Sequence, residues 1–261
     1  MTHDVHSVTF PVRYDECGPR GDARASVYMR LFQELAFAHS AALGFPLAWY
    51  EHHRFFWLLR RVNLVVLAPA RYGDALFCTT RVAGARRVMA RRINTAHRAD
   101  GTLIAAAMAD WIFTEGGVTP SRISQELRDA FPTLTRPVAP IPLEEVDPEE
   151  VRPTDGAPRN SLRIRLSDAD AMGHANNAVY FDLLDDAVAR SGGAATVDAH
   201  PRTYDLQYNS AAPVGAAVSE RAWSDGRGWH YRLESDAGAL HVHGRVIAEL
   251  APIGETQDVV R

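Results

Sequence analysis

The sequence predicts an α+β protein made of two similar units in tandem. Residues 13–36 align without a gap on residues 165–188, and the order of features is the same in both stretches and beyond them. One helical pattern is followed by several strand-length runs each time. Such self-similarity indicates an internal duplication, and 261 residues suit two units of about 120 residues each. The identical pairs are Arg13 and Arg165, Gly21 and Gly173, Ala23 and Ala175, Val27 and Val179, Tyr28 and Tyr180, and Leu31 and Leu183.

Composition excludes several classes of protein. The net charge of −4 gives no global reason to expect nucleic-acid or membrane binding. Cys17 and Cys78 are too few for a disulfide framework. No signal peptide opens the chain, and no apolar run approaches the roughly 20 residues that span a bilayer. We therefore expect a cytoplasmic protein.

In the first unit, residues 8–13 alternate as a short strand does, and residues 26–43 have helical spacing. Ser26 is a candidate N-cap for that helix, and Gly44 ends it. The stretch from residue 54 to residue 115 is rich in β-branched and aromatic residues, interrupted by turn residues, and predicts four strands. Thr119-Pro120 then predicts the start of a short amphipathic helix.

Residues 132–158 predict an interdomain linker. The segment contains seven prolines and a cluster of acidic residues, with too little apolar content to form a core. We therefore divide the chain into residues 1–131, this linker, and residues 159–261. The last part repeats the plan of the first, with a strand at 161–166, a helix at 177–190, and strands near 202–210, 214–224, 228–235 and 239–250.

One strand, a helix and several long strands predict a curved antiparallel sheet around a central helix. The second copy also carries the motif Asp170-Ala-Met-Gly-His174-Ala-Asn-Asn-Ala-Val-Tyr180, whereas the first copy has Gly18 and Asp22 at the Asp and His positions. Together these features resemble the hotdog fold in tandem, as in the acyl-ACP thioesterases and the 4-hydroxybenzoyl-CoA thioesterase group. The resemblance covers roughly residues 8–131 and 159–250.

The resemblance implies chemistry for the loop and for the helix that follows it. The residue at the position of Asp170 is a nucleophile or general base in that family, and His174 matches a catalytic histidine of the plant enzymes. The helix N-terminus adds free N–H groups for an oxyanion. A plainer interpretation makes Asp170 a turn residue and Asn176 or Asn177 a helix cap. The residues expected to contact substrate are Gly173, Asn176, Asn177, Tyr180, Tyr28, Glu16 and Glu34.

The motif also departs from the plant enzymes. Met172 stands where they have an asparagine, and Ala211 and Ala212 stand where they have a Glu-Cys pair. We therefore expect a simpler scheme in which Asp170 acts with His174 and helix amides. Glu16 and Glu34 are the candidate carboxylates of the first copy, which we expect to bind the acyl chain and to perform no chemistry. The apolar tunnel should run near Tyr28, Phe32, Phe37 and Tyr180.

Six arginines and no acid lie between residues 81 and 98. Coenzyme A and acyl carrier proteins are both anionic, so this stretch is a candidate docking surface; a solvated strand face is the competing interpretation. His241 and His243 share one strand face, but no third ligand is evident, so we expect neither a metal nor another cofactor. The docking residues we name are Arg86, Arg87, Arg91 and Arg92.

The sequence thus predicts an acyl-thioester hydrolase that acts on acyl-ACP or acyl-CoA, as a monomer or homodimer of double hotdogs. Two other classes stay open. One is a hotdog dehydratase or cyclising enzyme of a fatty-acid or polyketide pathway. The other is a non-catalytic acyl-binding module.

Overall fold

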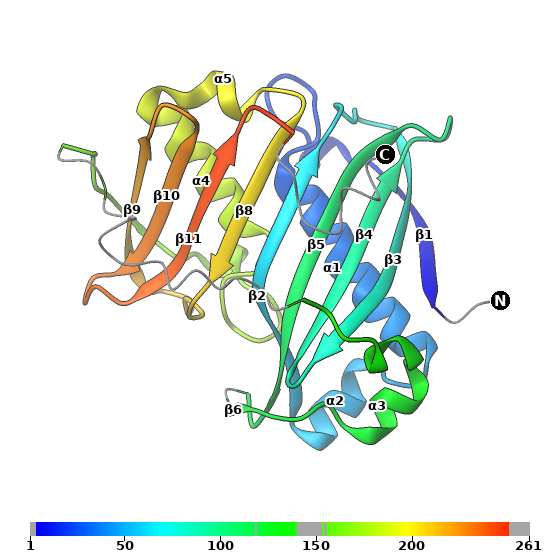
Figure 1. Ribbon diagram of the computed structural model, residues 1–261. Helices are drawn as coiled ribbons and strands as arrows, with labels where there is room; N and C mark the ends of the chain where they lie inside the picture. The colour runs from blue at the N-terminus through cyan, green and yellow to red at the C-terminus, as the bar shows by residue number, and fades with distance from the viewer. Residues whose placement is uncertain (1–3, 118, 140–152, 154–155, 251–261) are drawn as a thin grey trace.

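The computed structural model describes residues 4–117, 119–139, 153 and 156–250. Within these residues, eleven strands form a single sheet whose named strands pair antiparallel, in the order β1-β3-β4-β5-β2-β8-β11-β10-β9-β7, with β6 paired to β5. The two long helices lie on one face of this sheet (Figure 1). This confirms the predicted tandem hotdog architecture. No helix of the described part is long and apolar enough to cross a membrane.

The N-terminal half contains one long helix, α1 (Ala25–Ala42), and most of the longest strands. The helix ends where expected, because Gly44 adopts a φ of 94° that only glycine tolerates well. A short helix, α2 (Leu47–His53), then leads into the strands. The strands of this half are β1 (Val5–Pro11), β2 (Phe55–Val66), β3 (Ala75–Arg86), β4 (Met89–His97) and β5 (Leu103–Glu115).

The C-terminal half repeats this order around α4 (Val179–Val188). A π-helical turn (Ala189–Gly193) and α5 (Ala194–Val197) extend the helical segment past the predicted end at residue 190. The strands of this half are β7 (Asn160–Arg163), β8 (Arg202–Tyr208), β9 (Ala217–Ser224), β10 (Trp229–Ser235) and β11 (Leu240–Ile247).

The two halves join through strands β2 and β8, which lie at the centre of the sheet. Val62 pairs with Leu206, and Leu64 pairs with Tyr204. These four side chains are at most 1% exposed and belong to one apolar cluster together with residues of both helices. The central pairing removes one exposed sheet edge from each half, and the shared core makes the halves one packed structure.

The duplication is visible in individual hydrogen bonds. Gly73 donates to the carbonyl of Val12 (3.0 Å), and in the second half Gly215 donates to the carbonyl of Ile164 (2.9 Å). Likewise Ala23 donates to Ala70 (2.8 Å), and Ala175 donates to Ala212 (2.9 Å). In both cases the residue in or beside the loop recurs 152 positions later, and its partner recurs 142 positions later. The two loops before the central helices therefore have the same backbone fold.

Two local predictions are wrong. Ser26 lies inside α1 rather than capping it, and its hydroxyl accepts a hydrogen bond from Arg30 (3.0 Å). Thr119–Pro120 form the short strand β6 on β5, because Gly116 and Gly117 turn the chain back through positive φ angles of 65° and 93°. The helix that follows, α3 (Gln125–Ala130), begins after Ser124, whose hydroxyl caps it.

The first residues of the predicted linker pack against the N-terminal half. Residues 132–135 form a 3₁₀ turn, and Leu134 and Val138 are buried. The Ala85 N–H of β3 donates to the carbonyl of Arg136 (2.9 Å). The centre of the linker, residues 140–152, and the tail after residue 250 lie outside the described residues, and the predicted unit boundaries stay a prediction.

Candidate active site

The Asp170–His174 loop precedes α4 and is closed by its own backbone. The Asp170 N–H donates to the His174 carbonyl (3.0 Å), and the Gly173 N–H donates to the Asp170 carbonyl (3.0 Å). Gly173 has a φ of 78°, which a residue with a Cβ adopts only with strain. Asp170 and His174 are thereby held at the two ends of one tight turn, and both side chains are half-buried.

The Asp170 carboxylate has one engaged oxygen. Its Oδ1 accepts a hydrogen bond from the Met172 N–H (2.9 Å), which is the turn-forming role that the plainer interpretation assigned to it. Within the described part of the chain, Oδ2 accepts no hydrogen bond. The turn therefore fixes the carboxylate and leaves its second oxygen available to a reacting group.

Tyr180 of α4 lies close enough to Asp170 for the charge of the carboxylate to act on its hydroxyl. Its hydroxyl accepts a hydrogen bond from the Ala212 N–H (3.3 Å), and its ring meets that of Tyr208 edge-on, with 5.6 Å between centroids. Burial raises the pKa of Tyr180 to about 12, and the Asp170 charge acts in the same direction. Tyr180 is therefore neutral at physiological pH.

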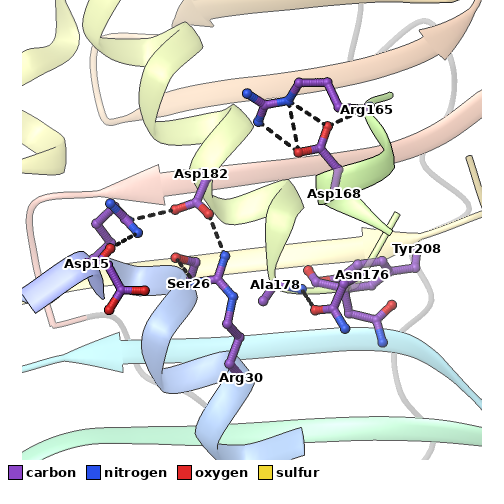
Figure 2. A network of polar contacts seen from close by, with 11 residues as sticks. Asp15, Ser26, Arg30, Arg165, Asp168, Asn176, Ala178, Asp182 and Tyr208 are labelled. Carbon is purple, nitrogen blue, oxygen red and sulfur yellow. Dashed lines mark hydrogen bonds and ion pairs between the residues drawn. The ribbon is translucent and has the colours of Figure 1, made fainter. Parts of the chain in front are cut away.

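Asn176 and Asn177 have different roles at the N-terminus of α4. The Asn176 Oδ1 accepts a hydrogen bond from the N–H of Ala178, the residue just before α4 (2.9 Å; Figure 2), so Asn176 orders the turn that leads into the helix. The Asn177 carbonyl accepts from the Tyr208 hydroxyl (2.9 Å). The Asn177 N–H donates to no acceptor among the described residues, so it is a candidate oxyanion donor.

Gln33 of α1 completes the site from the other half. The Asn177 side-chain amide donates to its Oε1 (3.1 Å). Arg60 of β2 also reaches across and donates to the Tyr208 carbonyl. Sequence reasoning missed both residues. An uncharged Gln33 beside the charged, exposed Glu34 carries only a weak signal in the sequence.

An ion pair fixes the crossing of the two central helices near this site. Asp182 of α4 accepts from Arg30 of α1 (2.8 Å; Figure 2) and lies 3.5 Å from the Arg24 guanidinium. The Arg30 and Arg24 side chains are 37% and 40% exposed, and that of Asp182 is 30% exposed. Ion pairs with this much exposure add little to stability, so their main effect is to position the helices.

The carboxylates of the first copy, Glu16 and Glu34, differ in what they contact. Glu16 accepts a hydrogen bond from the Arg13 N–H (2.8 Å), as Asp168 does from Arg165 (2.8 Å) in the second copy. Burial acts to raise the pKa of Asp168, but hydrogen bonds from Arg165 outweigh it and leave the pKa below its usual range. Both acids close their loops, which gives Glu16 a structural role.

Glu34 is exposed to solvent, and Phe37 is 49% exposed. Both side chains face solvent, and the predicted substrate contact of Glu34 and the predicted tunnel beside Phe37 stay predictions. Tyr28 and Phe32 are at most 2% exposed and face the core with the strands. Helix periodicity explains the difference, because positions 28, 32 and 35 face the sheet while positions 34 and 37 turn toward solvent.

The four arginines of the predicted docking surface separate into two pairs. Arg91 is 4% exposed and pairs with Asp110 (2.8 Å), and Arg92 reaches His39 of α1 (3.2 Å). Burial lowers the pKa of Arg92 to about 10. Burial of Arg91 on β4 does not fit a surface docking role for that residue, whereas Arg92 keeps partial exposure and its docking role stays a prediction.

Arg86 and Arg87 are exposed at the turn between β3 and β4. Arg87 lines an open depression of about 570 Å³ together with two arginines from the segment around α3. The residues that line it are Arg87, Val88, Arg122 and Arg128.

His241 and His243 share one face of β11, as their spacing predicts. The His241 Nδ1 lies 3.0 Å from the Ser210 hydroxyl, and the His243 Nδ1 lies 3.3 Å from the Asn209 Oδ1. Burial lowers the pKa of His243 to about 4. Among the described residues, no group of three His, Cys, Asp or Glu side chains is arranged to hold a metal ion.

Comparison with known proteins gives two findings. Residues 3–131 match the family model of the acyl-ACP thioesterase N-terminal domain. Among solved structures, a Lactobacillus plantarum protein described as a putative oleoyl thioesterase is 19% identical with a TM-score of 0.78, covering 93% of this chain and 94% of that one. No curated protein sequence matches the chain.

Two further solved structures are similar over the whole length. An acyl-ACP thioesterase from Bacteroides thetaiotaomicron is 16% identical with a TM-score of 0.73, covering 95% of this chain and 99% of that one. The 12:0-ACP thioesterase from Umbellularia californica is 18% identical with a TM-score of 0.74, covering 93% of each chain. The N-terminal half therefore matches the acyl-ACP thioesterase N-terminal domain, and the two halves together have the double-hotdog fold.

Proposed function

We propose that the protein hydrolyses an acyl-ACP or acyl-CoA thioester in the site between its two halves, with Asp170 as the reacting carboxylate. The observation that carries the proposal is the hydrogen bond between Asn177 and Gln33, because it ties the N-terminus of α4, which follows Asp170, to the other half of the chain. A carboxylate with one available oxygen and a helix N-terminus are the two groups that thioester hydrolysis requires.

In the proposed reaction, Asp170 acts as a general base or as the nucleophile. As a base, it takes a proton from water, and the water oxygen bonds to the thioester carbonyl carbon. The Asn177 N–H stabilises the resulting oxyanion, a contribution of about 10²–10³ in rate for one such donor. The C–S bond then breaks, and the thiolate leaves and takes up a proton. His174, at the other end of the turn, polarises the carbonyl or orients the water.

The site lacks two polar side chains that the plant enzymes have, at the positions of Met172 and Ala211. Met172 is 50% exposed and its side chain brings no hydrogen-bond donor, and Ala211 carries no carboxylate. The Ala212 N–H already donates to Tyr180 (3.3 Å). Asp170 is consequently the single carboxylate of the motif that supports the proposed chemistry.

The open depression beside Arg87 is the proposed anchor for the carrier. Arg87, Arg122 and Arg128 give it positive charge, which suits the phosphate of a phosphopantetheine arm or of coenzyme A. Combined substitution of the three by alanine should raise KM and leave kcat unchanged, and the increase should shrink at high salt. Arg227→Ala, at an exposed turn of the other half, is the control.

Release of free thiol from a panel of aliphatic and aromatic acyl-CoA and acyl-ACP thioesters tests the main proposal. Turnover that Asp170→Asn reduces by about 10²–10⁴-fold would support it. Mass spectrometry of the products separates the other classes. An intact thioester that has lost or rearranged atoms indicates a dehydratase or cyclising enzyme, and an unchanged, tightly bound thioester indicates an acyl-binding module.

Single-turnover hydrolysis in H₂¹⁸O distinguishes the two roles of Asp170. A nucleophilic carboxylate forms an anhydride with the acyl group, so label enters the Asp170 side chain when water attacks the aspartyl carbonyl. A general base passes all of the label to the released acid. Peptide mass spectrometry of the segment that contains Asp170 reads the difference.

A further inference from the structure

Arg92 of β4 is a partly buried cation that pairs with no carboxylate in the described part of the chain. Its Nη1 donates to the His39 Nδ1 of α1 (3.2 Å) and to the Thr80 hydroxyl (3.4 Å), and its guanidinium lies over the Phe131 ring, 5.8 Å from the centroid. Its Nε and Nη2 donate to no acceptor among the described residues. These two nitrogens form one edge of the guanidinium, the edge that binds a carboxylate in a bidentate pair.

The neighbouring arginine shows how a buried guanidinium is balanced elsewhere in this sheet. Arg91 points to the other face of β4 and pairs with Asp110, with 2.8 Å between the Nε and the Oδ1. Burial lowers the pKa of Arg92 to about 10, and the nearby Tyr50 acts in the opposite direction. Arg92 is therefore still charged at physiological pH. Buried charges are normally paired, so an unbalanced guanidinium on this face points to an anionic ligand.

Two further polar side chains on the same face of the sheet have a buried atom without a partner. Asn94 lies two residues after Arg92 on β4, so both point to one face. Trp111 of β5 pairs in register with Ala90, two residues before Arg92, and shares that face. In the described structure, neither the Asn94 Oδ1 nor the Trp111 Nε1 has a hydrogen-bond partner, and Asn94 is only 2% exposed. Buried polar groups are normally hydrogen-bonded, so these two also point to a polar ligand beside Arg92.

This face of the sheet is the one that α1 covers, and it also carries the candidate active site. Figure 1 shows α1 behind β4 and β5. Arg92 pairs in register with Ala109, which belongs to the apolar cluster around the two central helices. Tyr208 of β8 belongs to the same cluster, and its hydroxyl donates to the carbonyl of Asn177. Arg92 and the proposed oxyanion donor therefore lie on one side of one sheet.

Three strand spacings separate Arg92 from the candidate site. The strands follow one another as β4, β5, β2 and β8, and neighbouring strands lie about 4.8 Å apart, so β4 and β8 are about 14 Å apart. The Leu59–Trp111 pair occupies the two strands between them. Leu59 directly precedes Arg60, which donates to the Tyr208 carbonyl. An acyl chain that lies across this face, with its thioester at Asn177, therefore directs its distal end toward Arg92.

We propose that Arg92 binds a carboxylate at the distal end of the acyl group, so that the substrates are thioesters of dicarboxylic acids. The inference rests on the proposed function and names the substrate class of that same site. The Arg92 Nε and Nη2 donate to the two carboxylate oxygens, and the Trp111 N–H and the Asn94 amide are the further donors on this face. The other anion of this chemistry is a phosphate of coenzyme A or of the carrier arm. The covered face favours the acyl terminus, because exposed arginines around Arg87 already suit a phosphate.

The test measures thiol release from two acyl groups of equal chain length, one ending in a methyl group and one in a carboxylate. Each is prepared as a coenzyme A thioester and as an N-acetylcysteamine thioester, which has no phosphate. We expect wild type to favour the carboxylate member by at least about tenfold in kcat/KM in both series. Arg92→Met should remove this preference by slowing the carboxylate member alone, and Arg92→Lys, which keeps the charge, should retain part of it. Arg227→Met, at an exposed turn of the other half, is the control and should keep the preference.

Two patterns of loss in Arg92→Met would overturn the inference. A loss with both coenzyme A thioesters and with neither N-acetylcysteamine thioester would assign Arg92 to a phosphate. Equal losses with all four substrates, or none, would give Arg92 a structural role. If Arg92→Met does not fold, the wild-type comparison decides, because turnover without a preference for the carboxylate end overturns the inference and leaves the proposed function intact.

Absence of turnover with every thioester would refute the proposed function instead. Binding of the free dicarboxylic acid, measured by titration calorimetry against the monocarboxylic acid of the same length, then tests Arg92 without catalysis. Tighter binding of the dicarboxylic acid to wild type, lost in Arg92→Met, would support the carboxylate site. Equal binding of the two acids to wild type would overturn it.

Discussion

The side-chain amide of Asn177 donates a 3.1 Å hydrogen bond to the Oε1 of Gln33, which joins the start of one central helix to the middle of the other. The two residues are 144 positions apart in the chain. The contact makes the candidate site a product of both halves, because neither half supplies Asp170, Asn177 and Gln33 alone. The equivalent positions of the duplicated chain are Ala25 and Asp185, which cannot form the same amide–amide contact.

Substitutions test whether Asp170 and His174 of the loop, rather than Glu34 of α1, carry the chemistry. Asp170→Asn should lower turnover by about 10²–10⁴-fold with little change in stability, because the carboxylate makes one hydrogen bond within the described residues and Asn keeps it. His174→Ala should cost less. Glu34→Gln is the control and should change turnover by less than about tenfold, since its side chain is exposed. Loss of turnover in Glu34→Gln with full turnover in Asp170→Asn would move the chemistry to the first half.

The contact between Asn177 and Gln33 should show up as coupling between the two residues. Asn177→Ala and Gln33→Ala should each lower the free energy of unfolding by about 0.5–1.5 kcal/mol, and the double variant should cost less than their sum. Denaturant unfolding of the four proteins in a double-mutant cycle measures this. Additive changes would show that the two side chains do not interact in solution.

Much of the architecture could be predicted because duplication repeats each signal. Gly21 and Gly173 have φ angles of 79° and 78°, so both copies of the loop need glycine at the same position. Helix patterns of the two copies reinforce each other in the same way. Features that occur once, such as the Gly116-Gly117 turn before β6, had no second copy to support them, and there the local preference of Thr-Pro for a helix start misled the prediction.

The site was harder to predict because it depends on contacts across the duplication. Asp170 and His174 share a loop, and their proximity follows from spacing alone. Gln33 and Arg60 come from the other half, so only the pairing of β2 with β8 brings them in. Arg91 illustrates a different limit, because a series of arginines in the sequence does not reveal which of them lie on a covered face of the sheet.

The ion pair between Arg91 and Asp110 should matter for stability rather than for docking. Both side chains are at most 5% exposed, with 2.8 Å between the Arg91 Nε and the Asp110 Oδ1. Arg91→Ala should destabilise the protein by about 3–5 kcal/mol, because it leaves a buried carboxylate without this partner. Arg86→Ala, at an exposed turn, should change stability by less than about 0.5 kcal/mol. Thermal or urea unfolding compares the two, and equal small effects would mean that the Arg91 side chain is solvated.

Asp185 should make the stability of the fold depend on pH in a direction opposite to that of most carboxylates. Burial raises its pKa in the folded protein to about 7, whereas a free aspartate side chain has a pKa of 3.8. Between about pH 4 and about pH 7 the folded state therefore binds a proton that the unfolded state has released. The contribution of this proton to stability is fully present below about pH 4 and is lost as pH rises through the window, by at most about 1.4 kcal/mol per pH unit.

Other groups titrate in the same window, so the difference between wild type and Asp185→Asn isolates the effect. The pKa of His243 is lowered by burial to about 4, which makes stability rise with pH as its unfolded imidazole loses a proton. That contribution is common to both proteins and cancels in the difference. Urea unfolding at half-unit steps from about pH 4 to about pH 8 should show wild type losing stability relative to Asp185→Asn until about pH 7, and a constant difference after that. A difference that stays constant across the whole range would mean that Asp185 is ionised in the folded protein throughout.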